Sequence, residues 1–392
     1  MQNIKNKTKY LITISIITLF TLALIVSSMM AKTNFVVGAN FTPDTAHRSS
    51  VLMDFNSGKI LYDNNAHNKH PIASVTKLMT ILLTLEHIEE NNIDLKEKIV
   101  VSENASGMGG SQIFLDGNKE YEIGQLLKSV IVASANDSSV ALAEYISGSE
   151  KTFVKSMNEK ASLLELNNTH YSNCTGLPTN DGYSSAYDQA IVLKNVLKYD
   201  LYHTYSSIWM EDFTHPSGRI TQMTNTNKLS RFFEGCIGGK TGSTNQAKYC
   251  LAVGAERNNT KLISVVLGAE NSKERFKLAS DLLNYGFSNF ESKTLFSNRD
   301  LANKSIQIKG SKATVQLKAE EEYSIVTNKN EQINFSLNFH LPTQLKKVKE
   351  NDVVGVVEIV VDGIVEKTIN ILSCSTYEEP TIWDYFKEII SQ

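Results

Sequence analysis

Three short groups of residues in this chain have types and spacings suited to acyl transfer. The first is Ser74-Val-Thr-Lys77, where an amine stands three residues after a hydroxyl, at the start of an apolar run. Positions i and i+3 of a helix share a face, so the amine can reach the hydroxyl. Burial lowers the pKa of a lysine and lets it act as a base, and N–H groups at a helix start can stabilise an oxyanion. The motif predicts Ser74 as nucleophile and Lys77 as base, with a chance pairing as the alternative.

The second group is Ser134-Ala-Asn136, which lies between two predicted helical segments, as a turn would. A hydroxyl and an amide that point into a cleft can relay a proton and hold a substrate amide. The same form recurs at Ser102-Glu-Asn104 and Ser243-Thr-Asn245, so a purely structural turn or helix cap is the alternative.

The third group is Lys240-Thr241-Gly242, preceded by Gly238-Gly239 at the predicted start of a strand. Glycines at a strand edge let another backbone approach, so a substrate peptide could pair there as an added strand. Lys240 could hold a carboxylate and help lower the pKa of Lys77, while Thr241 donates a hydrogen bond. The spacing of these glycines does not fit a phosphate-binding loop.

Helices and strands from distant parts of the chain must bring these groups together. Residues 51–63 predict two short strands around an Asn-Ser-Gly turn, and residues 250–270 predict two more, joined at Asn258-Asn259. Ser74 to about Glu90 predicts a helix that is apolar nearly all round and therefore buried. Residues 91–200 are predicted to be mainly helical, and residues 272–287 to form an amphipathic helix. The predicted fold is α/β (α+β): an antiparallel sheet assembled from both ends of a domain, covered by helices, beside an all-helical lobe.

Two further segments follow this domain. Residues 303–374 alternate polar and apolar side chains, with a strong hairpin signal at Asp362-Gly363, so residues 289–376 are predicted to form a small all-β C-terminal domain. Residues 377–392 place apolar side chains on one helical face, which fits either a membrane-surface helix or a packed terminal helix. That face comprises Ile382, Trp383, Phe386, Ile389 and Ile390.

The N-terminus predicts export from the cytoplasm. Three lysines within the first nine residues precede the uncharged stretch from Tyr10 to Ala31, so residues 1–39 are a signal peptide or a membrane anchor. Cleavage sites are possible after Ala31 and Ala39. The net charge of −3 over 392 residues gives no electrostatic case for nucleic-acid binding.

Four well-separated cysteines without a CxxC pair do not predict a zinc site. Cys236 and Cys250 flank a predicted hairpin and are the best candidates for a disulfide. Four unpaired thiols are the alternative. No metal cluster, dinucleotide fingerprint or phosphate loop is present in the sequence, so no cofactor is implied.

Taken in order, the three motifs resemble the signatures of penicillin-binding proteins and serine beta-lactamases. The stretches "GMGGSQIFLDG", "NCTGLPTNDGYSSAYDQA" and "SKERFKLASDLLNYGF" look like those of the D-alanyl-D-alanine carboxypeptidases, the low-molecular-mass penicillin-binding proteins. The similarity spans roughly residues 45–375, with residues 45–288 as the catalytic domain.

The resemblance implies a membrane-associated serine carboxypeptidase that acts on peptidoglycan stem peptides ending in D-Ala-D-Ala, with beta-lactams as covalent inhibitors. Ser74 would be acylated with Lys77 as its base, and Ser134 and Asn136 would shuttle protons and position the substrate. Lys240, Thr241, Gly242 and Ser243 would line the cleft, and the N–H groups of Ser74 and Ser243 would form the oxyanion hole. Arg231 and Arg275 are candidates to bind the terminal carboxylate.

Three alternatives remain open at this level. A beta-lactamase of one group needs a glutamate three positions before a Leu-Asn pair, but position 163 is Leu and Glu165 is out of register. An endopeptidase that cuts cross-links would use the same motifs. A catalytically inactive wall-binding protein would not need all three motifs to be intact.

Overall fold

The computed structural model describes residues 41–311 and 313–378, so the predicted export segment and the predicted terminal helix lie outside the described residues. Within the described ranges, no helix is both long enough and apolar enough to cross a membrane.

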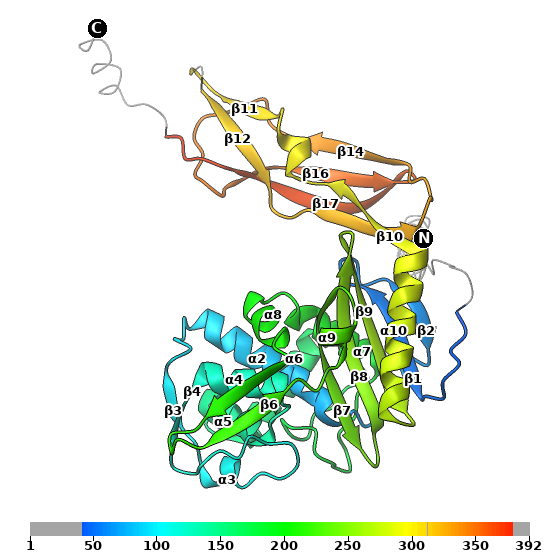
Figure 1. Cartoon of the computed structure of the whole chain (residues 1–392). Helices are drawn as coiled ribbons and strands as arrows, with labels where there is room; N and C mark the ends of the chain where they lie inside the picture. Colours follow the sequence, from blue (N-terminus) through cyan, green and yellow to red (C-terminus); the bar gives the residue numbers. More distant parts are fainter. Residues whose placement is uncertain (1–40, 312, 379–392) are drawn as a thin grey trace, which may run out of the picture. The chain divides into compact units, whose positions relative to one another are not determined.

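One five-stranded antiparallel sheet is assembled from two distant parts of the chain (Figure 1). Two strands come from its N-terminal part and three from the region after residue 235, and the spatial order is β2-β1-β9-β8-β7. Asn258 and Asn259 at the β8–β9 turn both have positive φ, as a tight two-residue hairpin requires. The sheet confirms the predicted fold class. Its strands are β1 (Ser49–Asp54), β2 (Ile60–Asn64), β7 (Cys236–Thr244), β8 (Lys248–Arg257) and β9 (Thr260–Ala269).

Both faces of this sheet are covered, because its central strands are apolar on both sides. On β9, Ile263 and Val265 belong to the core of the helical lobe. Leu262, the residue before Ile263, faces the other way and lies against Gly286 of helix α10 (Ser272–Asn289), where an added β-carbon would come within 2.4 Å of the leucine. This alternation follows from the two-residue period of a strand.

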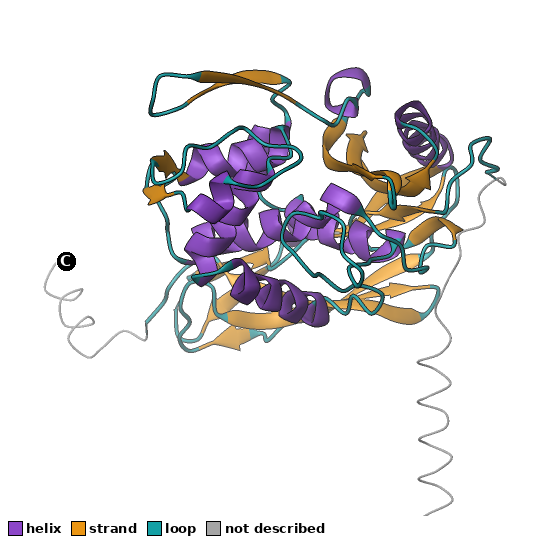
Figure 2. Ribbon diagram, turned by 90° about the horizontal axis from the view of Figure 1, so that it is seen from below, coloured by secondary structure: helices purple, strands orange, loops and turns teal. Residues whose placement is uncertain are grey.

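The helical lobe lies beside the sheet (Figure 2). Helix α2 (Lys77–Glu90) contributes Leu78, Met79, Ile81, Leu82 and Leu85 to its core. Most of α2 is buried, as predicted, and side-chain caps at Ser149 and Ser185 begin two of the other helices. The region 91–200 is less continuously helical than predicted, because it also holds a short antiparallel pair of strands (β3 and β4) and a long loop, residues 164–185. The remaining lobe elements are β3 (Lys98–Val100), α3 (Glu103–Ser106), β4 (Glu120–Glu122), α4 (Ile123–Val132), α5 (Asn136–Ser147), α6 (Glu150–Leu163), α7 (Ala186–Val196), α8 (Asp200–Ser206), β5 (Met210–Thr214), β6 (Ile220–Thr224) and α9 (Leu229–Phe232).

Two local expectations differ from the structure. The predicted helix at Ser74 begins as a 3-10 turn, η1 (Ala73–Thr76), and becomes α-helical at Lys77. The Lys240-Thr-Gly group lies inside β7 and not at its start, because the strand already begins at Cys236 and bulges before Gly238. Gly238 and Gly239 were interpreted from the sequence as the start of the strand, whereas in the structure they lie within it.

The candidate disulfide between Cys236 and Cys250 is not present, since all four cysteines are free thiols. Across the β7–β8 hairpin, Cys236 pairs with Ala255 and Cys250 pairs with Gly242. The two cysteines thus lie at different levels of the hairpin, too far apart in register for a bond.

The C-terminal part of the described chain is all-β apart from one short 3-10 turn, η2 (Asn298–Leu301). Its six-stranded sheet has the order β14-β16-β17-β12-β11-β15, and β10 pairs separately with β13. Positive φ at Asp362 and Gly363 confirms the predicted hairpin turn between β16 and β17. The strands are β10 (Phe290–Phe296), β11 (Ser305–Ile308), β12 (Thr314–Ala319), β13 (Tyr323–Asn328), β14 (Phe335–His340), β15 (Gln344–Leu345), β16 (Val353–Val361) and β17 (Ile364–Ser373).

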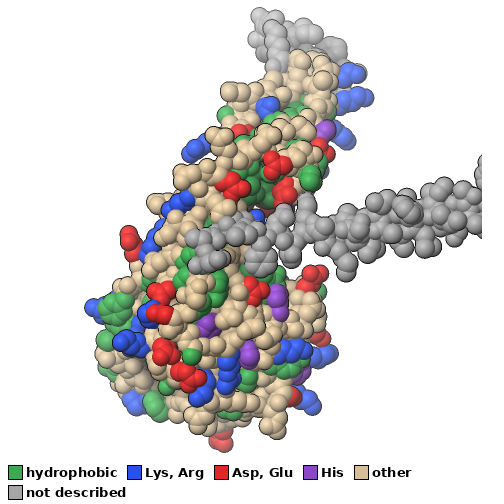
Figure 3. Space-filling model, turned by 90° about the vertical axis from the view of Figure 1, so that its right-hand side faces the viewer, with side chains coloured by type: hydrophobic (Ala, Val, Ile, Leu, Met, Phe, Trp, Pro, Cys, Tyr) green, Lys and Arg blue, Asp and Glu red, His purple; other side chains and the backbone are tan. Residues whose placement is uncertain are grey.

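Charged side chains of both signs are interspersed on the face of the molecule shown in Figure 3. No continuous basic stripe is visible there, which agrees with the low net charge of the chain.

Candidate active site

Ser74 lies in the tight turn that leads into α2. The preceding residue, Ala73, has φ of 49°, a left-handed conformation that is uncommon for a residue with a side chain. Ala73, Val75 and Thr76 are buried, whereas Ser74 itself is half-buried. The turn therefore holds its neighbours in the core and leaves the Ser74 hydroxyl at the edge of the packed region.

Lys77 is the first residue of α2 and is completely buried. Its Nζ donates to Ser74 Oγ at 2.9 Å and to the carbonyl oxygen of Thr175 at 2.6 Å. Burial lowers the pKa of Lys77 to about 7, since a charged ammonium is disfavoured away from water. The predicted pair of hydroxyl and amine is thus in contact, with an amine that can lose its proton near neutral pH.

Thr175 is a site residue that the motifs did not identify. Its carbonyl is aimed at Lys77 because Asn173 Oδ1 accepts hydrogen bonds from the backbone nitrogens of Thr175 and Gly176 and fixes the local turn. A β-carbon on Gly176 would lie 2.0 Å from the carbonyl oxygen of Ala73, so the loop 164–185 packs directly on the turn of Ser74. The Asn-x-x-Gly pattern was the available signal.

Ser134 and Asn136 lie where α4 passes into α5, as the sequence predicted. Ser134 is buried with φ of 62°, and Asn136 is the first residue of α5. Asn136 Nδ2 donates to the carbonyl oxygen of Gly109 at 2.6 Å, and its backbone nitrogen donates to that of Ser111 at 2.7 Å. Its Oδ1 is buried without a hydrogen-bond partner among the described residues, and such an acceptor is available to a donor that enters the site.

Lys240, Thr241 and Gly242 lie on β7, which is an edge strand of the sheet. Gly242 lets β7 come close to the turn of the candidate nucleophile, because a β-carbon there would be 2.9 Å from the backbone nitrogen of Ser74. Thr241 and Gly242 are buried, whereas the following residue, Ser243, is exposed. An open edge and a close approach to Ser74 are what a strand that pairs with an extended substrate requires.

Lys240 is completely buried, and its Nζ donates to the carbonyl oxygen of Thr241 at 3.3 Å. Burial lowers its pKa well below the ordinary value, and the positive charges of Lys77 and Arg275 lower it further. Repulsion from Lys240, which was expected to help lower the pKa of Lys77, is therefore not the main cause of that shift. Burial is the cause at Lys77, and the repulsion between the two amines acts on Lys240.

The two candidate arginines have different surroundings. Arg275 of α10 donates to the carbonyl oxygens of Gly242 at 3.0 Å and Cys250 at 3.3 Å, so its side chain connects α10 to both β7 and β8. Arg231 of α9 is exposed and lies over the rings of Trp209 and Phe232. Binding of a substrate carboxylate by either arginine stays a prediction.

Comparisons with known proteins agree with this geometry. The family of D-alanyl-D-alanine carboxypeptidases matches residues 37–271, and the C-terminal domain of penicillin-binding protein 5 matches residues 290–379. The chain is 40% identical over 295 residues to the D-alanyl-D-alanine carboxypeptidase DacF of Bacillus subtilis, covering 75% of this chain and 76% of that protein. It is 34% identical over 351 residues to the D-alanyl-D-alanine carboxypeptidase DacA of Haemophilus influenzae, covering 86% and 88%.

Solved structures give the same result. Penicillin-binding protein 5 from Haemophilus influenzae superposes with a TM-score of 0.68 at 30% sequence identity, covering 87% of this chain and 100% of that one. Penicillin binding protein 6B from Escherichia coli does so with a TM-score of 0.64 at 28% identity, covering 86% and 98%. The fold and the family match extend through both the sheet-containing domain and the small β domain. The chain therefore belongs to the family of serine-type D-alanyl-D-alanine carboxypeptidases, which are hydrolases of the penicillin-binding protein 5 type.

Proposed function

We propose that this enzyme removes the terminal D-alanine from peptidoglycan stem pentapeptides through an acyl-enzyme on Ser74. The observation that carries the proposal is the buried Lys77 amine, 2.9 Å from Ser74 Oγ. Because burial brings its pKa to about 7, a large fraction of the amine is unprotonated at neutral pH and can accept the hydroxyl proton.

Acylation begins when Ser74 gives its proton to Lys77 as Oγ bonds to the carbonyl carbon of the penultimate D-alanine. The N–H groups of Ser74 and Ser243 stabilise the negative charge on the carbonyl oxygen. The carbon–nitrogen bond then breaks, and the leaving D-alanine nitrogen takes up the proton, which Ser134 relays from Lys77. Asn136 holds the substrate amide during this step.

Deacylation returns the enzyme to its starting state. A water molecule gives a proton to the Lys77 amine and attacks the ester carbonyl. The bond to Ser74 Oγ then breaks, and the oxygen recovers its proton. The terminal carboxylate of the substrate is bound by the Lys240 amine and the hydroxyl of Thr241, beside Gly242 and Ser243 of the strand.

Beta-lactams are expected to acylate Ser74 and to leave slowly. The position at which some beta-lactamases carry a deacylating glutamate is Leu163, at the end of α6, and its side chain is 78% exposed. A long-lived adduct is the behaviour of an antibiotic target and not of a resistance enzyme.

We place the enzyme outside the cytoplasmic membrane, either attached to it or released to the cell wall. The basic residues Lys5, Lys7 and Lys9, followed by the uncharged stretch from Tyr10, support export. The stem peptide is found in the cell wall, so substrate and enzyme would share a compartment.

The test is D-alanine release from a synthetic peptide that ends in D-Ala-D-Ala, with protein that lacks residues 1–39. Release by the parent and by Ser207→Ala, an exposed serine of the C-cap of α8, with none from folded Ser74→Ala, is the expected result. Release by Ser74→Ala would overturn the assignment of the nucleophile. No release by folded parent protein would overturn the proposed activity.

A further inference from the structure

A loop between α3 and β4, residues 107–117, is attached by its main chain to the start of α5. We call this loop the strap. Its carbonyls at Gly109 and Ser111 accept hydrogen bonds from Asn136, through Nδ2 at 2.6 Å and the backbone nitrogen at 2.7 Å. An added β-carbon on Gly110 would lie 2.8 Å from Asn136 Nδ2, so the strap is packed tightly on this side chain.

The Gly109 carbonyl fixes which end of the Asn136 carboxamide faces which way. A carbonyl oxygen can only accept, so the amide must turn its NH₂ group towards Gly109. The remaining end, Oδ1, is then the buried acceptor without a partner among the described residues. If the strap moved away, the amide could rotate and present a donor where the site offers an acceptor.

The inner side of the strap is held by Asp137, the residue after Asn136. Its Oδ2 accepts hydrogen bonds from the backbone nitrogens of Ile113 at 3.2 Å and Leu115 at 3.0 Å. Asp137 is completely buried, and burial raises the pKa of its carboxyl group. The strap thus supplies the N–H groups that a buried carboxylate needs.

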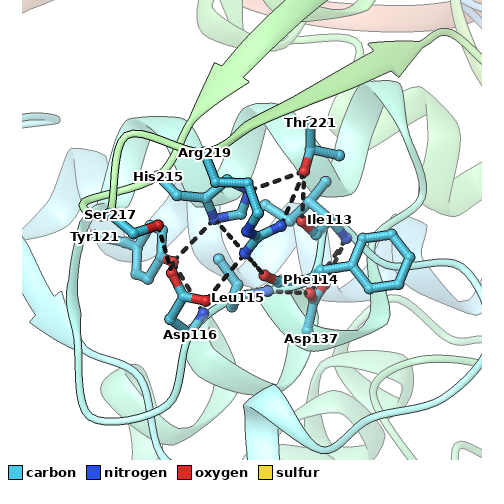
Figure 4. A network of polar contacts seen from close by, with 10 residues as sticks. All are labelled: Ile113, Phe114, Leu115, Asp116, Tyr121, Asp137, His215, Ser217, Arg219 and Thr221. Atoms are coloured by element: carbon cyan, nitrogen blue, oxygen red, sulfur yellow. Dashed lines mark hydrogen bonds and ion pairs between the residues drawn. The ribbon is translucent and has the colours of Figure 1, made fainter.

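The outer side of the strap is held by the β5–β6 hairpin (Figure 4). Arg219 donates through Nη2 to the carbonyl oxygen of Phe114 and to Asp116 Oδ1, the latter at 3.0 Å. Thr221 donates to the carbonyl oxygen of Ile113 at 3.2 Å. Phe114 has φ of 63°, so its backbone is in a left-handed conformation that surrounding contacts must maintain.

His215 and Tyr121 also take part in the contacts between the β5–β6 hairpin and the strap. Nδ1 of His215 lies 3.0 Å from the Tyr121 hydroxyl and 3.1 Å from Arg219 Nη2. Nε2 of the same ring lies 2.9 Å from the Thr221 hydroxyl. The backbone nitrogen of Asp116 donates to the Tyr121 hydroxyl at 2.9 Å. These contacts orient Arg219 towards the strap.

We propose that Arg219 is a positioning residue for the reaction: it holds the strap against α5 so that Gly109 fixes the carboxamide of Asn136. The proposal rests on the proposed role of Asn136 in the site. Arg219 itself is exposed and belongs to a hairpin that contributes none of the three motifs. It acts on the site through two hydrogen bonds to the strap and, beyond them, through the Gly109–Asn136 contact.

The experiment measures the second-order rate of acylation by benzylpenicillin and D-alanine release in Arg219→Ala and Arg219→Lys. The Ala variant is expected to lose roughly ten- to a hundredfold in both rates, because small displacements of a positioning group have effects of that size. The Lys variant can restore one of the two contacts and should fall in between. Glu211→Gln, on the same hairpin as Arg219, is the control, because it removes the charge from the 2.6 Å ion pair with Lys128 of α4 and does not involve the strap.

A double-mutant cycle with Asn136→Ala separates positioning from a general structural effect. If Arg219 acts through Asn136, Arg219→Ala changes the acylation rate less than twofold in the Asn136→Ala background. Multiplicative losses, equal losses in Glu211→Gln, or an unchanged rate in folded Arg219→Ala would each overturn the proposal. Failure of the proposed function is distinct, because the parent protein would then release no D-alanine.

Discussion

Gly242 of the edge strand and Ser74 of the turn before α2 are so close that a β-carbon on the glycine would lie 2.9 Å from the serine nitrogen. The same atom would lie 2.7 Å from the carbonyl oxygen of Ile72. Both neighbours are main-chain atoms in the core and cannot swing aside as a flexible side chain would. The distance between β7 and the candidate nucleophile is therefore set by the absence of a side chain at position 242.

Gly242→Ala is expected to lower the rate of acylation by benzylpenicillin about 10²-fold, because it pushes the strand away from Ser74 by a fraction of an ångström to an ångström. The rate is followed by mass spectrometry of the covalent adduct, with the melting temperature as a check on folding. An unchanged rate in a protein of normal melting temperature would show that the close approach has no role in catalysis.

The rate of acylation is expected to depend on pH through Lys77. The amine must be neutral to accept the Ser74 proton, and burial brings its pKa to about 7. Below pH 7 the active fraction should fall about tenfold for each pH unit, and above pH 8 it should level off. The measurement is kcat/KM for D-alanine release between pH 5 and 9, with melting temperatures at each pH. A flat profile over this range would contradict Lys77 as the base.

Lys240 is expected to lower the free energy of unfolding of this enzyme at neutral pH. Burial holds its pKa in the folded protein well below the ordinary value. At neutral pH the unfolded chain therefore binds more protons at this residue, and stability should rise as the pH rises towards the unfolded pKa of about 10.4.

Lys240→Met should therefore raise the melting temperature at pH 7 and greatly slow D-alanine release. Its advantage in melting temperature over the parent should shrink as the pH rises from 7 to 9.5. Lys155→Met, on a side chain that is 78% exposed in α6, is the matched control and should change neither property. A lower melting temperature for Lys240→Met at every pH would show that contacts of the lysine stabilise the fold instead.

The sequence was sufficient for those parts of the site that are made of side chains in local patterns. Ser74 and Lys77 are one helical turn apart, Ser134 and Asn136 lie in a turn between helices, and apolar periodicity marks α2 as buried. Each of these follows from a period or a turn that is local in sequence. The assembly of one sheet from both ends of the domain was also predicted, because short strands were expected at each end with helical segments between them, but the order of the strands was not.

Parts that depend on backbone atoms or on register could not be predicted in this way. The carbonyl of Thr175 is present whatever its side chain, so no residue type marks it as the partner of Lys77. The separation of Cys236 from Cys250 depends on where the β7–β8 turn falls. The β5–β6 hairpin was missed because its strands are mostly polar and exposed, without the apolar alternation of a half-buried strand.

Two glycines with nearly the same backbone conformation provide a matched test of the loop that holds Lys77. Gly176 has φ of +76° and Gly148 has φ of +73°, so alanine is strained equally at both positions, by about 1 kcal/mol. They differ in surroundings, because a β-carbon on Gly176 would lie 2.0 Å from the carbonyl oxygen of Ala73, whereas one on Gly148 meets nothing within 4 Å.

Gly148→Ala is therefore expected to lower the stability modestly and to leave acylation unchanged. Gly176→Ala should in addition lower the acylation rate by about 10²-fold, because the loop must shift and carry the Thr175 carbonyl away from Lys77. The shift should also be visible in the pH profile, since loss of the carbonyl removes a hydrogen bond to the ammonium and favours the neutral amine. The apparent pKa for acylation should then fall below that of the parent. Equal effects of the two substitutions on rate and on pH profile would show that the loop does not position Lys77.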